Sequence, residues 1–306
     1  MKIIFYKNNF ELIKNIFTII KNNTDSIIHS HLTKADIICS IIKKIKFNKL
    51  KLVTTRPYDY NINKFSYFLY GNFYRYIGNF NFQITISKQI LNLIKFNEKY
   101  KNNLNTKIIN YAAEDKSNIR INQKKNFIKI SIVGRLLKWK NHITIINHFN
   151  NPIFKNFIIV NKIKFYIYGT GPLYEFLQQS ININKLSNYI KIFTNIENPD
   201  YIYYDTDILL HPSLSEGFGL VAIESMSFKI PVICNKNIGM SEIVKSISNQ
   251  LVINVNSSDE LIKSINFTLN NYDFIANKSY KLFLKKFSFK VMSQEYYKVY
   301  KYIYEK

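Results

Sequence analysis

The chain of 306 residues is 47% hydrophobic and 16% aromatic, which argues against a disordered protein and allows two domains with buried cores. Its 43 Lys and Arg residues against 20 Asp and Glu residues give a formal net charge of +23. That charge favours anionic partners such as nucleic acid, acidic lipid or phosphorylated small molecules, but the lysines are spread so evenly that it does not choose among them.

Short apolar runs typical of strands alternate along the first half with longer segments of helical period, the pattern of a parallel sheet with crossover helices. The predicted strands are SIIHS from residue 26, KLVTT from 51, FQITIS from 82 and TKIIN from 106, and KADIICSIIKKI from 34 is a predicted helix. We expect an α/β domain over residues 1–115, followed by a linker over 116–126 within a polar stretch that has no periodicity.

The same alternation returns in the second half. Strands are predicted at FIKISIVG from 127, KFYIYG from 164, YIKIFT from 189, DILLHP from 207, IPVIC from 230 and QLVINV from 250. We expect a second α/β domain over 127–288 and a carboxyl-terminal helix over 289–306 that could pack back on the first domain. Two such domains would enclose a cleft, where ligands bind at the carboxyl ends of strands.

Two of the strand ends carry basic or glycine residues. In VGRLLKWKN, Arg135 and Lys140 follow a strand that ends in Gly134, and a basic pair at that position is placed to meet an anion. In YGTGPLYEFL, Gly169 and Gly171 form a turn before a helix. The full dinucleotide fingerprint is absent, so this glycine pair fits a tight strand-to-helix turn equally well.

The stretch HPSLSEGFGLVAIES places Glu216 in a glycine turn and Glu224 in the helix that follows. A glycine turn that opens a helix exposes backbone N–H groups and is a site for phosphate. Carboxylates would repel that phosphate, so they suit neutral hydroxyls, and the combination indicates a sugar nucleotide. The alternative is that Glu216 caps the helix and Glu224 is a solvated residue.

These three motifs resemble, in order and spacing, the carboxyl-terminal half of the retaining group 1 glycosyltransferases, which have the GT-B fold. The resemblance covers Ile128 to Ile253, and weaker landmarks of the family's acceptor domain occur in DSIIHSHLTKADI, LVTTRPYDY, QITISKQI and KIINYAAED. It implies two Rossmann-like domains facing across a cleft. The chain reaches IIHSHL by residue 27, so the first domain is abbreviated, without its first strands and glycine-rich loop, or the start has been lost.

The resemblance implies that Arg135 and Lys140 hold the donor pyrophosphate, that Glu216 binds the donor sugar and that Glu224 binds the ribose. The implied catalytic set is Arg135, Lys140, Glu216 and His31, and His31 would lie beside the acceptor. The implied donor-binding set also contains Gly134, Gly169, Thr194, Ile196, Gly217, Phe218, Gly219 and Leu220. Thr194 and Asn195 stand where relatives usually have glycine, so the base pocket could differ.

Acceptor-side candidates follow the first two strands. His31 and His29 end a strand and could face the cleft, and two histidines at this spacing also suggest a metal, but no third ligand of suitable spacing is near. Many relatives carry a histidine near the reaction centre after the next strand, where this chain has Arg56. Arg56, Asp59 and Tyr60 are therefore candidates, although TRPYDY also fits an ordinary loop.

A metal and a cofactor are not expected. Asp205 and Asp207 form an Asp-x-Asp pattern that glycosyltransferases of another fold use to bind manganese, but Asp207 precedes a buried strand and fits a structural role. In the family that this chain resembles, basic residues replace the metal, and the donor is a substrate rather than a cofactor.

The resulting hypothesis is a metal-independent, retaining enzyme that moves a sugar from a nucleoside-diphosphate sugar, expected to be a UDP-sugar, to a glycan or lipid-linked acceptor in surface polysaccharide or glycolipid synthesis. A non-catalytic sugar-nucleotide-binding protein is the alternative. A third hypothesis, a basic nucleic-acid-binding protein, is weakened because the sequence contains no docking motif.

Cys39 and Cys234 form no disulfide framework, and the apolar runs are shorter than the ~20 residues of a spanning helix. We expect a cytoplasmic protein that could contact an anionic membrane surface.

Overall fold

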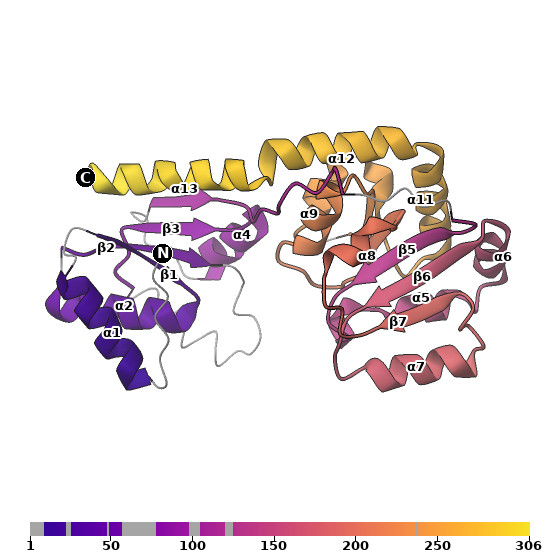
Figure 1. Cartoon of the computed structure of the whole chain (residues 1–306), viewed down its shortest axis with the longest axis horizontal. Helices are drawn as coiled ribbons and strands as arrows, with labels where there is room; N and C mark the ends of the chain where they lie inside the picture. Colours follow the sequence, from indigo (N-terminus) through magenta and orange to yellow (C-terminus); the bar gives the residue numbers. More distant parts are fainter. Residues whose placement is uncertain are drawn as a thin grey trace. The chain divides into compact units, whose positions relative to one another are not determined.

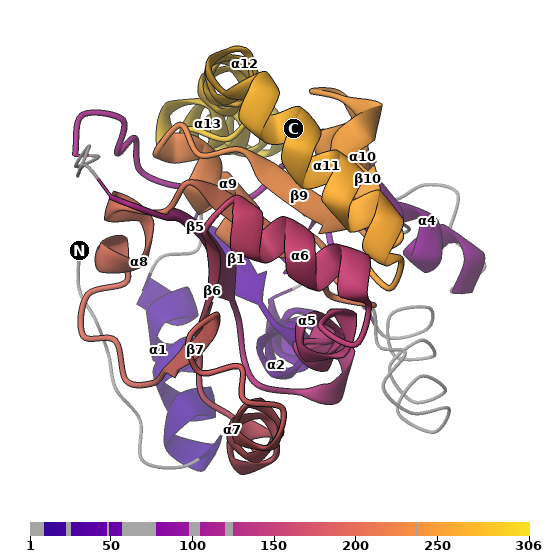
Figure 2. The same ribbon diagram turned by 90° about the vertical axis from the view of Figure 1, so that its right-hand side faces the viewer.

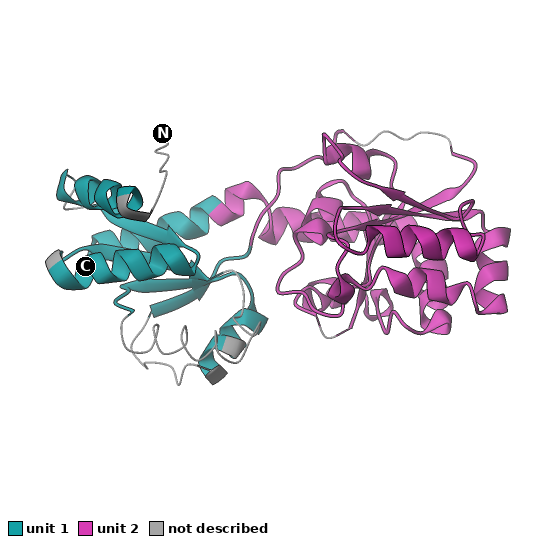
Figure 3. Cartoon of the chain, turned by 90° about the horizontal axis from the view of Figure 1, so that it is seen from below, with its two compact units in different colours: residues 1–110, 293–306 teal, residues 111–292 magenta. Residues whose placement is uncertain are grey.

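The computed structural model describes residues 9–22, 26–47, 49–56, 78–97, 105–119, 125–236 and 238–306. It contains two compact units, which Figure 3 shows in two colours: residues 1–110 with 293–306, and residues 111–292. The division after Asn110 falls before the predicted linker at 116–126. The last residues of the chain, from Ser293 on, belong to the first unit.

The first unit is a parallel α/β sheet with strand order β1-β2-β3-β4 (Figure 1). Its strands are β1 (Ile27–His31), β2 (Lys51–Arg56), β3 (Phe82–Thr85) and β4 (Asn105–Ile108), and its helices are α1 (Asn9–Asn22), α2 (Thr33–Lys46), α4 (Lys88–Asn97) and most of α13 (Phe289–Tyr304). His31 pairs in register with Thr55, and Arg56 pairs with Thr85, so these residues lie at the carboxyl ends of neighbouring strands.

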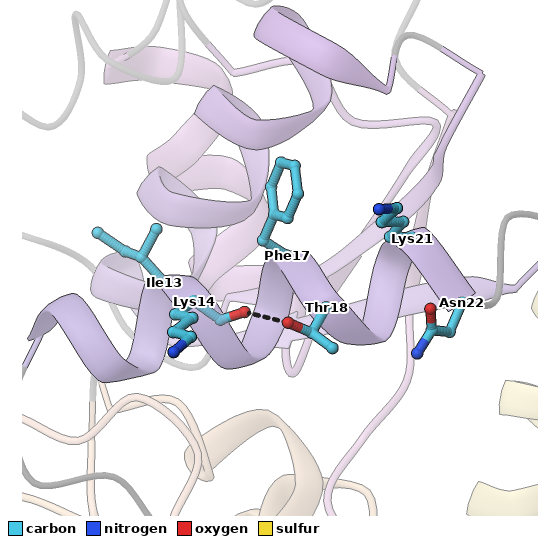
Figure 4. Close-up of a pocket in the computed structure, with 6 residues that line it drawn as sticks. All are labelled: Ile13, Lys14, Phe17, Thr18, Lys21 and Asn22. Carbon is cyan, nitrogen blue, oxygen red and sulfur yellow. Dashed lines mark hydrogen bonds between the residues drawn. The ribbon is translucent and has the colours of Figure 1, made fainter.

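Apolar side chains hold α1 against α2 in the first unit. Ile20, Ile42 and Leu50 are buried, and Phe17 contacts Phe47 at a ring-centroid distance of 5.3 Å. Helix α1 also carries a pocket, shown in Figure 4, that is lined by Ile13, Lys14, Phe17, Thr18, Lys21 and Asn22. None of the predicted site residues lines this pocket.

The second unit is a six-stranded parallel sheet of order β10-β9-β8-β5-β6-β7. Its strands are β5 (Ile128–Val133), β6 (Ile163–Tyr168), β7 (Ile190–Phe193), β8 (Ile208–His211), β9 (Val232–Asn235) and β10 (Val252–Ile253). Its helices are η2 (Lys138–Lys140), α5 (Ile143–His148), α6 (Pro152–Val160), α7 (Tyr174–Ile183), α8 (Asp200–Tyr204), α9 (Leu220–Ser227), α10 (Ser241–Lys245), η3 (Asn249–Leu251), α11 (Ser258–Asn270) and α12 (Tyr272–Lys286).

Helices cover both faces of this second sheet, as Figure 2 shows. The strands are therefore almost continuously apolar, and Ile130, Phe165, Leu209 and Val232 are all 0% exposed. All ten predicted strands form, and the predicted α/β class with two parallel sheets is confirmed. Within the described ranges, no helix combines the length and apolar character needed to cross a membrane.

Candidate functional site

In the second sheet, the direction in which successive strands are added reverses between β5 and β8. The chain moves outward from β5 to β7, returns to β8 on the other side of β5, and moves outward again to β10. Ile130 of β5 pairs with Ile208 of β8, so the loops that follow these two strands leave the sheet side by side. Such a switch point is where open α/β sheets bind ligands, outside the carboxyl ends of the strands.

Hydrogen bonds join the loop after β5 (residues 134–142) to the loop after β8 (residues 212–219). The backbone N–H of Leu214 donates to the carbonyl of Trp139 at 2.8 Å, and the side-chain amide of Asn141 donates to the carbonyl of Pro212 at 3.3 Å. Asn141 has a φ of 57°, a left-handed conformation that asparagine tolerates better than most residues. The two loops therefore form one edge, although 71 and 75 residues separate the bonded partners in sequence.

This edge brings Lys140 and Glu216 together. The Lys140 ammonium donates to Glu216 Oε2, and the two side chains are 19% and 21% exposed. His211, the last residue of β8, places its Nε2 atom 3.3 Å from the same carboxylate oxygen. Glu216 does not cap the following helix, because Gly219 holds the cap position of α9 and the carboxylate turns to Lys140 instead.

The neighbours of Glu216 also determine its charge. Burial alone would raise the pKa of the Glu216 carboxyl, but His211 and Lys140 hold that pKa at about 2. Burial lowers the pKa of His211, against the opposing effect of Glu216. At neutral pH the Glu216 carboxyl is therefore ionised and the His211 imidazole behind it is neutral.

Arg135 differs from Lys140. Its side chain is exposed, and it forms no ion pair with any residue in the described part of the chain. Gly134 lies next to Lys140, since a Cβ atom at Gly134 would lie 3.6 Å from the Lys140 side chain. The sequence-predicted basic pair thus supplies one cation that is paired with Glu216 and one that is open to a ligand.

Gly169 and Gly171 allow the loop after β6 to pack against the loop after β5. A Cβ atom at Gly169 would lie 2.0 Å from the carbonyl oxygen of Gly134, and one at Gly171 would lie 2.7 Å from the carbonyl oxygen of Leu136. The N–H of Gly134 donates to the carbonyl of Tyr168 at 3.0 Å. The second glycine motif therefore has a structural explanation, and Gly169 still lies at the edge of the candidate site.

The turn from Glu216 to Gly219 leads into α9. Gly219 has a φ of 86°, in the region that favours glycine, and the N–H of Gly239 donates to the Glu216 carbonyl at 2.7 Å. The Phe218 side chain is 3% exposed and packs on Tyr111 and Phe287, with ring centroids 5.7 and 6.1 Å away. Phe218 thus anchors the turn. The N–H of Ala222 donates to the Gly219 carbonyl at 3.0 Å, whereas those of Leu220 and Val221 precede the first acceptor that the helix offers.

Glu224 has a partner that the sequence did not reveal. The hydroxyl of Tyr203, from α8, donates to Glu224 Oε2 at 2.6 Å. Tyr203 is 2% exposed and stacks on Phe228 at 5.2 Å, and burial raises its pKa, so the hydroxyl remains a donor. Nothing in YIYYD distinguishes Tyr203 from its neighbours, because the contact depends on how α8 packs against α9.

The residues after β7 show how this chain does without a glycine. Asn195 has a φ of 53°, the left-handed conformation in which asparagine often replaces glycine. Thr194 and Ile196 on either side are partly exposed. The N–H of Gly169 donates to the carbonyl of Phe193 at 3.0 Å and joins this loop to the loop after β6.

In the first unit, His29 and His31 have different environments. His29 is bonded through both ring nitrogens, Nδ1 to the Tyr300 hydroxyl at 2.6 Å and Nε2 to the Thr55 hydroxyl at 2.7 Å. Burial, and then the neighbouring His31, lower the pKa of His29 to about 4. His31 stacks on His29 at a centroid distance of 4.3 Å and is exposed. The structure thus assigns His29 a structural role and leaves His31 accessible.

The remaining acceptor-side candidates gain no support from geometry. Arg56 is 1% exposed, so its guanidinium is closed off from solvent, and its part in acceptor binding stays a prediction. Asp59 and Tyr60 lie outside the described residues.

The Asp-x-Asp pattern is engaged in ion pairs. Asp205 pairs with Lys129, and Asp207 pairs with Lys125 at 2.8 Å and accepts the backbone N–H of Lys129 at 2.7 Å. The carboxylates thus fasten the loop after α8 to the start of β5. No cluster of three or more His, Cys, Asp or Glu side chains suited to a metal occurs among the residues described.

Comparisons with known proteins identify relatives of this chain. A sequence profile described as Glycosyl transferases group 1 matches residues 112–282, more than half of the chain. An uncharacterized glycosyltransferase of Methanocaldococcus jannaschii is 31% identical over 152 residues, which is 47% of this chain and 43% of that protein. The O-antigen biosynthesis glycosyltransferase WclY of Escherichia coli is 26% identical over 140 residues, 46% of this chain and 39% of WclY. The chain thus matches less than half the length of either relative.

Solved structures confirm the predicted GT-B fold class. A glycosyltransferase from Rickettsia africae superposes with a TM-score of 0.78 at 19% identity, covering 99% of this chain and 84% of that one. HepE of Anabaena, solved in complex with UDP, superposes with a TM-score of 0.78 at 17% identity, covering 94% and 81%. With a family match that spans most of the second unit, the chain belongs to the group 1 glycosyltransferases.

Proposed function

We propose that this protein transfers a sugar from a nucleoside-diphosphate sugar to a hydroxyl of a glycan or lipid-linked acceptor, with retention of configuration and without a metal. The observation that carries the proposal is the contact of Lys140 with Glu216 at the switch point of the second sheet, beside the open guanidinium of Arg135. One edge thus holds two cations for a diphosphate and one carboxylate for hydroxyls.

Each group has a part in donor binding. The diphosphate would accept bonds from Arg135, Lys140 and the N–H groups at the start of α9, where the helix dipole favours negative charge. Glu224, held by the Tyr203 hydroxyl, would accept hydrogen bonds from the ribose hydroxyls. Glu216 would accept hydrogen bonds from hydroxyls of the donor sugar. Charge-assisted hydrogen bonds of this kind contribute about 1.5–3 kcal/mol each.

In the transfer, the bond between the anomeric carbon and the diphosphate oxygen breaks, and a bond to the acceptor oxygen forms on the same face of the sugar. The acceptor proton passes to the leaving phosphate. Arg135 and Lys140 would stabilise the charge that develops on that phosphate, which is the task a metal performs in other glycosyltransferases. His31, exposed at the end of β1, is the proposed acceptor-side residue of the first unit.

A UDP-sugar is the proposed donor, because HepE and the pneumococcal transferase GtfA were both solved with UDP. The role of WclY in O-antigen biosynthesis supports a surface glycan as the product.

The net charge of +23 supports a place at the inner, anionic face of a membrane. Equal flotation with neutral and acidic liposomes would contradict that location.

The test is release of UDP from a panel of UDP-sugars, with glycan acceptors, by the wild type and by Arg135→Ala, Lys140→Ala and Glu216→Ala. We expect turnover by the wild type in the presence of EDTA and a loss of about 100-fold or more in each variant. Lys138→Ala and Glu175→Ala, which alter exposed residues, are the matched controls. Three variants as active as the wild type would show that this is not the site, and binding without turnover would indicate a non-catalytic protein.

A further inference from the structure

We propose that His211 is the positioning residue for Glu216: its Nε2–H holds the carboxylate in place for the donor sugar when Lys140 turns to the diphosphate. This inference rests on the proposed function, since it names the residue through which Glu216 keeps its orientation. His211 itself does not touch the substrate in this scheme.

The first argument is that Lys140 and His211 meet the same oxygen, Glu216 Oε2, from supports of different rigidity. Lys140 ends the short helix η2 and has a long side chain that can move to a phosphate. His211 ends β8, pairs in register with Cys234 of β9 and is 1% exposed, so it cannot follow. Of the two groups on Glu216, only the imidazole stays in place while a ligand binds.

The second argument is an unused hydrogen-bonding capacity. His211 Nε2 is buried and has no aligned hydrogen-bond partner among the described residues, although Glu216 Oε2 lies 3.3 Å from it. A buried polar group without a partner is unfavourable, so a small rotation that completes the bond is favoured. Withdrawal of Lys140 would free Oε2 to accept that bond.

The third argument is charge. The groups that face His211 are Glu216, Lys140 and His142, and the His142 ring is 2% exposed with an unpartnered Nδ1 in the described structure. Burial, and then Lys140 and His211, lower the pKa of His142 to about 4, and burial lowers that of His211. Both rings are therefore neutral, so His211 can donate to Glu216 without competing with the two cations for the diphosphate.

The test compares His211→Leu, which removes the donor, with His211→Gln, whose amide keeps a donor near Nε2. In the full-length protein we expect His211→Leu to raise the Kd for the UDP-sugar about tenfold, as loss of one hydrogen bond to a charged group would. The Kd for UDP should not change, because UDP lacks the sugar. His211→Gln should restore most of the loss.

The pH profile separates positioning from a general structural effect. His211 helps to lower the pKa of Glu216, so its removal should raise that pKa and move the acid limb of kcat/KM to higher pH in His211→Leu, and less in His211→Gln. The inference would be overturned if both variants had the pH profile and the UDP-sugar affinity of the wild type. So would equal losses of UDP and UDP-sugar binding.

Two further measurements keep the result interpretable. Circular dichroism and thermal unfolding show whether each variant is folded, and if the leucine variant is not, the glutamine variant and Glu216→Gln in its background still test the coupling. An inactive wild type that binds no UDP would refute the proposed function itself. An active wild type with an inactive Glu216→Ala variant, but unchanged His211 variants, would refute only the role of His211.

Discussion

The carboxyl edges of the two sheets use their polar residues in different ways. In the second unit, Lys140 and Glu216 come from loops after neighbouring strands, contact each other and remain partly exposed. In the first unit, Arg56 also ends a strand but is buried, and His29, in the middle of the neighbouring strand β1, is bonded to α13 and β2. A polar residue at a strand end thus indicates a site only when it stays accessible next to a complementary group.

The two sheets also differ in what packs against these residues. In the first unit, α13 lies against the strands: Tyr300 bonds to His29, Glu295 pairs with Lys107 at 2.6 Å, and the Phe82 and Tyr302 rings meet at 6.0 Å. In the second unit, the loops after β5, β6 and β8 pack on each other through glycines and backbone hydrogen bonds. That packing leaves the Arg135 side chain exposed and the Lys140 side chain partly exposed.

The largest expected effect tests the packing of those loops. Gly169→Ala should lower the free energy of unfolding by about 3 kcal/mol, because its Cβ would overlap the Gly134 carbonyl and its φ of 156° is strained for alanine. Gly134→Ala is the matched control, with a φ of 155° but only the Lys140 side chain nearby, at 3.6 Å. Urea denaturation measures both. Equal losses would mean that the close approach of the loops does not matter.

A smaller effect tests the second acid of the site. Glu224→Gln should weaken UDP binding by about 2 kcal/mol, or about 30-fold in Kd, because the ribose would lose a charged acceptor. The fold should persist, since the glutamine amide oxygen can still accept from Tyr203. Glu175→Gln, on the exposed side of α7, is the control in isothermal titration. Unchanged UDP affinity in Glu224→Gln would remove Glu224 from the donor site.

The smallest effect tests the first unit. Tyr300→Phe should lower the free energy of unfolding by about 1 kcal/mol, because His29 would lose one of its two partners. Hydrogen exchange should show faster opening of α13. Tyr297→Phe, at a site 66% exposed, should have no effect in the same experiment. If the two variants behaved alike, the bond between His29 and Tyr300 would not be what holds α13 on the sheet.

The sequence predicted what local patterns determine. All ten strands, the carboxyl-terminal helix and the glycine turn before Leu220 follow from apolar period and turn residues, and the motif order led to the correct family. It did not predict the partners of the site residues. Tyr203 beside Glu224 and Tyr300 beside His29 depend on tertiary packing between separate elements, and His211 meets Glu216, five residues later, only because of the path of the loop after β8.

The asparagines that stand in for glycine show a second limit of prediction from the sequence. In the sequence, Asn195 departs from the glycine that relatives usually have in the base-side loop. Its φ of 53° nevertheless gives the backbone the left-handed conformation that glycine adopts easily, and Asn141 does the same at 57°. The residue type alone did not reveal the geometry of the turn. The left-handed conformation became evident only from the backbone.

The central claim is that Glu216 recognises the sugar and that its neighbours Lys140 and Arg135 recognise the diphosphate. Isothermal titration of UDP and of a UDP-sugar that the wild type turns over, into the wild type and Glu216→Gln, tests it most directly. We predict that the substitution raises the Kd for the UDP-sugar about 30-fold and leaves the Kd for UDP unchanged. The same affinity for the UDP-sugar in both proteins, or an equal loss for both ligands, would contradict the account.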